Sequence, residues 1–200
     1  MLVVTCSLSY LPTYSYVGMP TERTRACHKY KLTTAPDITL FPDHTEVFEV
    51  EKTMLGEVVE WDESAPPPTT DTVLYSCVRK RSQGEFHAYG LTTVKLLTCG
   101  QTVQTKRILT PQMYSTLLAT KQDTKRHVVK QRRHCFRSEH QSFHVSQWVE
   151  PHAHAGTWFV VVQCESEPKI PDYLSVGPEL HSLTSSGKEY SFSEMSLKSE

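Results

Sequence analysis

Short segments in which apolar and polar residues alternate follow one another between residues 46 and 165, and this pattern restricts the fold more than any other feature. A period of two places successive side chains on opposite faces of a β-strand. The first such segment, "VFEVEKTML", sets Phe48, Val50 and Met54 against polar neighbours. The pattern therefore predicts strands with two chemically different faces.

Six further segments carry the same signal, and most are joined by short connections. "SQG" and the turn at Cys99-Gly100 separate three of them, which favours hairpins. The sequence predicts these strands at 72–81, 85–99, 102–108, 126–137, 142–150 and 157–165.

One helix is expected at 110–120, "TPQMYSTLLAT". Thr110 can cap it, Pro111 fits the first turn, and Tyr114, Leu117 and Leu118 fall on one face. About seven strands in hairpin order with one packed helix predict a mainly β (α+β) fold. We expect an antiparallel sheet that curls into a closed or partly open barrel or tunnel.

The 200 residues suit one domain, which we place at 46–198 behind a poorly ordered leader at 1–40. The leader is interrupted by prolines and shows no sustained period. Near the end of the chain, only "YSFSEMSLK" looks able to pack. Six cysteines lie far apart without a C-x-x-C pair, so we expect reduced thiols and a cytoplasmic protein. We expect neither a signal peptide nor a membrane anchor, so that any contact with membranes would be peripheral.

The net charge of -1 gives no general argument for binding nucleic acid, and we expect none to be bound. The charges are nevertheless sorted along the chain. Residues 41–71 hold nine carboxylates and one lysine, whereas residues 121–137 hold seven Lys or Arg and one aspartate. The basic segment includes "RHVVKQRRH", which its strand pattern distinguishes from an unstructured nuclear-import tag.

Polar residues two positions apart share a face, and five expected strands contain such sets. Either these sets form the solvent face of a half-buried sheet, or they line an interior that must be hydrated, self-paired or filled by an anion. In the strand expected at 126–137, Arg126, Lys130 and Arg132 would then point inward and Arg133 outward. The other sets are Glu49 with Glu51, Arg79 with Arg81, Thr93 with Lys95, and Gln163 with Glu165.

This succession resembles the CYTH fold of triphosphate tunnel metalloenzymes, in which eight antiparallel strands form a tunnel, basic residues hold a polyphosphate, and carboxylates hold Mg or Mn. The segments "VRKR", "QRRHCFRSEHQSFHVSQWVEP" and "IPDYLSVGPEL" with "GKEYSFSEMSLK" resemble the C-terminal CYTH-like half of the TRPL translocation defect protein family. That resemblance implies phosphoinositide binding and a part in moving a TRP-type channel between membranes.

The sequence departs from both patterns. It contains no G-x-x-x-x-G-K-[ST] motif, so the P-loop domain of that family is not implied. The signature E-x-E-x-K is broken because Lys52 follows Glu51 directly, and Gln104, Lys106, Ser146 and Gln163 stand where the resemblance implies carboxylates. A metal-dependent phosphohydrolase needs hard oxygen ligands, so we expect no hydrolysis.

The leading hypothesis is a non-catalytic domain that binds phosphatidylinositol phosphates or another polyphosphate anion without a cofactor. Such a domain would lie at an anionic membrane surface and serve trafficking of a channel, in contact with a channel or trafficking protein. The expected anion-binding residues are Arg79, Arg81, Lys95, Arg126, Lys130 and Arg132.

Two alternatives stay open. One is a triphosphatase that acts on tripolyphosphate or a nucleoside triphosphate, with Mg or Mn held by Glu49, Glu51 and Glu165. The other is a structural adaptor whose acidic and basic groups pair with each other. Zinc at the histidine-rich segment 140–154 and a thiol nucleophile at Cys135 are less favoured, because isolated histidines and a cysteine on a strand are more often structural.

Overall fold

A computed structural model describes residues 3–7, 26–56, 66, 68–99, 102–180 and 192–198. Within these residues, ten strands form one antiparallel sheet in the order β1-β6-β5-β4-β3-β7-β8-β9-β2-β10. The strands are β1 (Val3–Ser7), β2 (Ala26–Leu32), β3 (Glu46–Leu55), β4 (Thr72–Gln83), β5 (Phe86–Leu96), β6 (Thr102–Leu109), β7 (Val129–Ser138), β8 (Gln141–Glu150), β9 (Trp158–Cys164) and β10 (Val176–Glu179).

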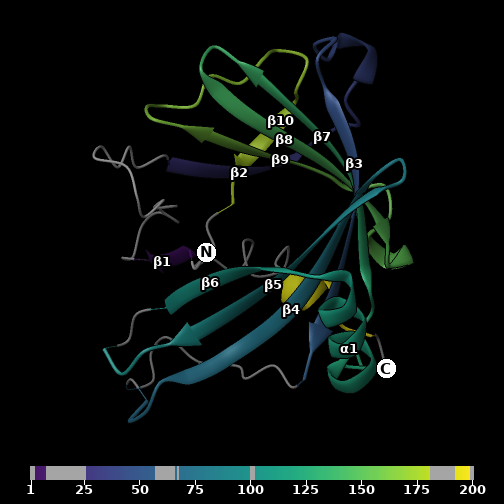
Figure 1. Ribbon diagram of the computed structural model, residues 1–200. Coiled ribbons are helices and arrows are strands. Elements are labelled where there is room, and N and C mark those ends of the chain that lie inside the picture. Colours follow the sequence, from purple (N-terminus) through teal and green to yellow (C-terminus); the bar gives the residue numbers. More distant parts are fainter. Residues whose placement is uncertain are drawn as a thin grey trace.

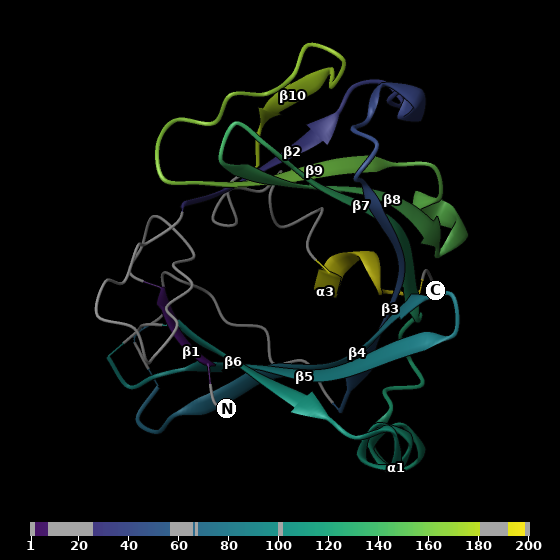
Figure 2. The same cartoon turned by 45° about the horizontal axis from the view of Figure 1, so that its top comes forward.

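The sheet curls strongly around one side. Figures 1 and 2 show β4, β5 and β6 in a lower half, β7, β8, β9, β2 and β10 in an upper half, and β3 joining the two. In the described residues β1 and β10 end the strand order and do not pair with each other, so the sheet is not closed. The predicted mainly β, antiparallel fold with one longer helix is confirmed at this level.

Two parts of the expected leader at 1–40, residues 3–7 and 26–32, belong to strands of the sheet. These residues form β1, which pairs with β6, and β2, which lies between β9 and β10. The segment "ACHKYKL" alternates cysteine and lysine with His, Tyr and Leu, so neither face of β2 is uniformly apolar and the strand period is hidden. Residues 8–25 of the expected leader lie outside the described residues.

The helix α1 (Pro111–Lys121) begins as the sequence predicts. The Thr110 side chain accepts a hydrogen bond from the Met113 backbone N–H, and Pro111 occupies the first turn. Tyr114, Leu117 and Leu118 pack against a cluster that includes Val78, which comes from the face of the lower strands turned away from the curl. We call this outer side of the sheet the convex face (Figure 2).

The largest apolar core lies in the upper half. Phe136, Phe143, Val145 and Val160 belong to it, together with Leu174 from the segment before β10. Phe41, which follows the short helix η1 (Ile38–Leu40), covers the same cluster. A second 3-10 helix, η2 (His152–His154), connects β8 to β9. The core therefore holds the upper strands together on their convex side.

The short helix α3 (Phe192–Met195) lies inside the curl (Figure 2). Met195 is fully buried against Val129, Trp148 and Phe159. The expectation that this C-terminal segment can pack is confirmed for residues 192–198. We call the side of the sheet that carries α3 the concave face. No helix within the described residues combines the length and the apolar character that crossing a membrane requires.

Candidate anion-binding face

Strand register shows which side chains lie on the concave face, because residues directly opposite each other in antiparallel strands share a face. Lys52 of β3 lies on the α3 side, with its Nζ 5.2 Å from the centre of the Phe192 ring. Arg79 of β4 is opposite Lys52, and Arg81 is opposite Val50 two positions away. Both arginines therefore lie on the concave face.

The same reasoning adds basic residues from four other strands. Lys106 of β6 is opposite Thr92, which is opposite Cys77 of β4. Arg133 of β7 is opposite both Phe48 and Ser146. His144 of β8 is opposite Val161 of β9, which is opposite Lys29 of β2. We call the following set the basic cluster: Lys29, Lys52, Arg79, Arg81, Lys106, Arg133 and His144.

Lys52 lies near the centre of this cluster and shows its electrostatic character best. Burial, together with the positive charge of Arg133, lowers the pKa of Lys52 to about 7. Arg79 and Lys29 act in the same direction. Desolvation is the larger cause, and the contributions of like charges show that Lys52 lies among other basic side chains.

The pKa values of two other members of the basic cluster, Lys106 and His144, are lowered by the same two causes. Burial, followed by the charge of Arg79, lowers the pKa of Lys106 to about 8. Burial, followed by Arg133 and Arg81, lowers the pKa of His144 to about 4. Arginine charges therefore act on buried basic groups from β6 in the lower half of the sheet to β8 in the upper half.

Two of the arginines are held in defined orientations. Arg133 donates from Nε to Ser146 Oγ at 3.1 Å and from a terminal nitrogen to Gln131 Oε1 at 2.9 Å. The guanidinium carbon of Arg81 lies 3.3 Å from the centre of the Phe48 ring, in a cation–π stack. Arg79, in contrast, is exposed on the concave face. The cluster thus combines fixed donors with an accessible one.

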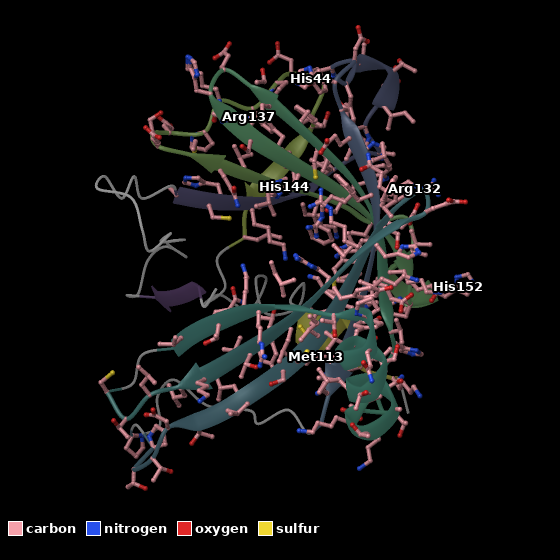
Figure 3. All side chains as sticks on the ribbon, viewed as in Figure 1. His44, Met113, Arg132, Arg137, His144 and His152 are labelled. Atoms are coloured by element: carbon pink, nitrogen blue, oxygen red, sulfur yellow. The ribbon has the colours of Figure 1, made fainter. Side chains whose placement is uncertain are left out.

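Glu49, Glu51, Lys130 and Arg132 lie on the convex face, so the predicted inward orientation is wrong for them. Glu49 is opposite Arg132, and its Oε1 lies 2.8 Å from Arg132 Nε; Figure 3 shows Arg132 on the outer side. Glu51 is opposite Lys130 and accepts a hydrogen bond of 3.4 Å from Tyr114 of α1. Phe48 and Val50 occupy the inward positions of β3, and Arg133, expected to point outward, points inward.

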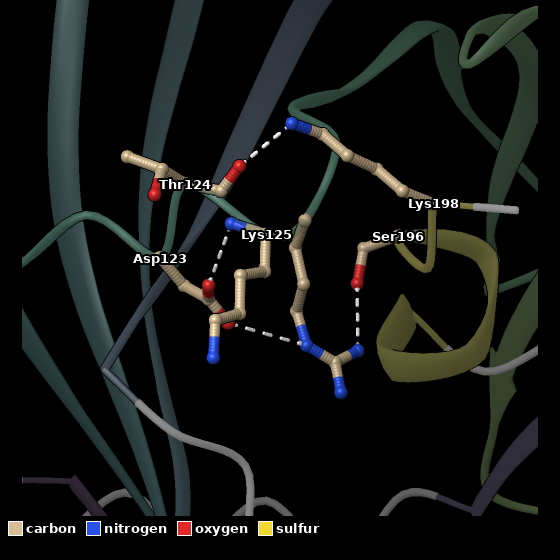
Figure 4. Close-up of polar contacts among 6 residues, drawn as sticks. Asp123, Thr124, Lys125, Ser196 and Lys198 are labelled. Atoms are coloured by element: carbon tan, nitrogen blue, oxygen red, sulfur yellow. Dashed lines mark hydrogen bonds and ion pairs between the residues drawn. The ribbon is translucent and has the colours of Figure 1, made fainter. Parts of the chain in front are cut away.

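The two other predicted basic residues, Lys95 and Arg126, have different surroundings. Lys95 is opposite Val73 on the convex face and is exposed. Arg126 precedes β7, where its Nε lies 3.4 Å from Asp123 Oδ2 and a terminal nitrogen donates to Ser196 Oγ at 3.2 Å (Figure 4). Arg126 thus joins the chain before β7 to the C-terminal segment.

The metal ligands expected for the enzyme alternative do not come together. Glu49 and Glu51 lie on the convex face, whereas Glu165 follows β9 and lines a cavity of about 430 Å³ with His28, Tyr30 and Glu179. Among the described residues, no three His, Cys, Asp or Glu side chains are grouped so that they could hold a metal ion. Burial also raises the pKa of Cys135, which disfavours a thiolate there.

Sequence reasoning missed Lys29, Lys52, Lys106, Arg133 and His144 as members of one site. The sequence did contain a sign of Lys106. In "QTKR", Gln104 and Lys106 lie two positions apart, on one face of a strand, where the resemblance implies acidic residues.

Comparison with known proteins adds no family: no protein-family model matches the chain, and no curated protein matches it. The resemblance to CYTH-like domains therefore stays a prediction.

Proposed function

We propose that this chain is a non-catalytic domain that binds a phosphorylated anion on its concave face. The observation that carries the proposal is the basic cluster, in which burial and neighbouring cations lower the pKa of Lys52 to about 7 and that of Lys106 to about 8. Phosphoinositide headgroups and soluble polyphosphates share the required chemistry, namely several negatively charged oxygens within a few ångströms of one another.

An anion would relieve the mutual repulsion in this cluster. Each added negative charge favours the protonated forms of Lys52 and Lys106, so binding should take up protons. Arginines recognise phosphate through pairs of parallel hydrogen bonds, and lysines contribute mobile point charges. Arg79, Arg133 and Lys106 come from three different strands and could contact separate oxygens of one ligand.

The finer fold proposal is a partly open tunnel of the CYTH type, with the basic cluster as its lining. By that resemblance, we propose that the domain acts in the cytoplasm, at membranes, in trafficking of a channel protein. The triphosphatase alternative requires Glu49 and Glu51 beside the bound anion, but these carboxylates lie on the convex face. Their position favours a receptor over an enzyme.

Isothermal titration calorimetry with tripolyphosphate and with a soluble inositol phosphate tests the proposal. Arg79→Ala should weaken binding by about tenfold or more, since charge-assisted bonds contribute roughly 1.5–3 kcal/mol each. Lys95→Ala is the matched control, because Lys95 is an exposed cation of the adjacent strand on the convex face. No binding by the unmodified chain would contradict the proposal and favour the self-paired adaptor.

A second measurement distinguishes the enzyme alternative. Release of phosphate from tripolyphosphate is followed with Mg or Mn present. Turnover that Glu51→Ala abolishes would defeat the receptor proposal, whereas binding without turnover supports it.

A further inference from the structure

An apolar strip lies on the concave face where β4 turns into β5. Phe86 is 83 % exposed and Ile108 is 84 % exposed, the highest values among the large apolar side chains that the structure describes. Ala88 lies on β5 between Phe86 and Gly90, the residue opposite Ile108, and is also exposed. The turn between β4 and β5 projects from the sheet in Figures 1 and 2, so the strip borders the basic cluster at an accessible edge.

Register places this strip directly beside two arginines. Ala88 is opposite Arg81, and Gly90 is opposite both Arg79 on β4 and Ile108 on β6. A Cβ at Gly90 would lie 3.7 Å from a terminal nitrogen of Arg79, so the guanidinium reaches across β5. A row from Arg79 through Gly90 to Ile108 therefore crosses three strands, and Phe86 lies about 13 Å further along β5.

Exposed apolar side chains that adjoin a row of cations match the boundary between headgroups and acyl chains of an anionic bilayer. A second copy of the chain is a poorer occupant, because a symmetric contact through this strip would bring the arginines of both copies together. Arginines near an anionic leaflet are instead attracted to it.

We propose that Phe86 and Ile108 insert into the headgroup boundary of an anionic bilayer while Arg79 and Arg81 contact lipid phosphates. This inference rests on the proposed function and names the source of the anion: a phosphate group held in a membrane. The concave face would then open toward the bilayer at the β4–β5 edge.

The test uses the full chain and two ligands. One is phosphatidylcholine–phosphatidylserine vesicles that contain a phosphatidylinositol phosphate, assayed by co-sedimentation; the other is soluble tripolyphosphate. Phe86→Ser and Ile108→Ser should each lower vesicle partitioning by about tenfold. Neither should change the tripolyphosphate affinity by more than about twofold, because neither side chain belongs to the basic cluster.

Val73→Ser is the matched control. Val73 is an apolar residue of β4 that is 44 % exposed on the convex face, so its replacement should leave vesicle binding unchanged. Unchanged vesicle binding by Phe86→Ser and Ile108→Ser would overturn the membrane contact and leave anion binding intact.

Two further outcomes separate the claims. Sedimentation that shows an oligomer dissociated by Phe86→Ser, with vesicle binding unaffected, would overturn the inference in favour of a second copy. Vesicle binding that depends on Phe86 and Ile108, in a chain that does not bind tripolyphosphate, would retain the membrane contact and overturn the proposed anion site.

Discussion

The concave and convex faces of the sheet carry similar charged residues, but the charges are paired differently on the two faces. On the convex face, Glu49 forms an ion pair with Arg132 of β7, and Lys130 forms one with Glu150 of β8, so acids and bases from adjacent strands neutralise each other. On the concave face, Lys52 lies opposite Arg79, and burial with neighbouring cations depresses its pKa. Opposite-charge pairing produces a solvated surface, whereas like-charge convergence produces a site that favours an anion.

Charge reversal on the two faces should give the largest contrast. Arg79→Glu on the concave face should weaken tripolyphosphate binding by about 100-fold or more, because it replaces attraction with repulsion in a partly desolvated site. Lys95→Glu on the convex face should change the affinity by less than about threefold through long-range effects. Calorimetry on both variants makes the comparison, and equal losses would show that only the overall charge matters.

Removal of the central cation should stabilise the protein. Because the folded pKa of Lys52 is about 7 and the unfolded value is near 10.4, the unfolded chain binds more protons between these pH values. The destabilisation by Lys52 is thus greatest below pH 7 and is relieved as the pH rises. Lys52→Met should raise the unfolding free energy by about 2 kcal/mol at pH 6 and less at pH 9, after discounting for partial exposure.

Urea denaturation at the two pH values measures this effect. Lys95→Met on the convex face serves as the control and should leave the free energy of unfolding nearly unchanged at both. A Lys52→Met variant that is equally destabilised at pH 6 and pH 9 would contradict the electrostatic interpretation of the concave face.

Anion binding should depend on pH in a way that convex-face cations cannot reproduce. Lys52 and Lys106 lose protons in the free protein near pH 7 and pH 8, so a bound anion must restore those protons at higher pH. We expect the tripolyphosphate affinity to fall by about tenfold between pH 7 and pH 9. Calorimetry in buffers of different ionisation enthalpy should detect proton uptake at pH 8, and its absence would separate these lysines from the ligand.

The Glu49–Arg132 pair on the convex face should show the smallest effect. Both side chains are 54 % exposed, and exposed ion pairs contribute roughly 0.2–1 kcal/mol. A double-mutant cycle of Glu49→Ala and Arg132→Ala in urea denaturation should give a coupling energy in that range, reduced by salt. A coupling energy above about 2 kcal/mol would mean that this face is not simply solvated.

Local features of the chain were predictable because they depend on neighbouring residues. Thr110 and Pro111 indicated the start of α1, and "SQG" indicated the turn between β4 and β5, where Gly84 adopts a φ of 56°. β2 was not predicted because neither of its faces is uniformly apolar. One face consists of Cys27, Lys29 and Lys31, so the strand lacks the alternation that is typical of a half-buried sheet. Five of the seven members of the basic cluster were missed, and Lys29 is the one that lies on this strand.

The sequence by itself determined that each strand has two different faces, since alternation with a period of two fixes which residues share a side. It did not determine which side is concave. That was decided by the pairing of β3 with β7, segments about eighty residues apart, and by the direction in which the sheet curls. A shift of the inward face by one residue turns every side chain of a strand to the opposite side. The expected face was right for β4, where Arg79 points inward. It was off by one residue for β7, where Arg133 points inward in place of Arg132.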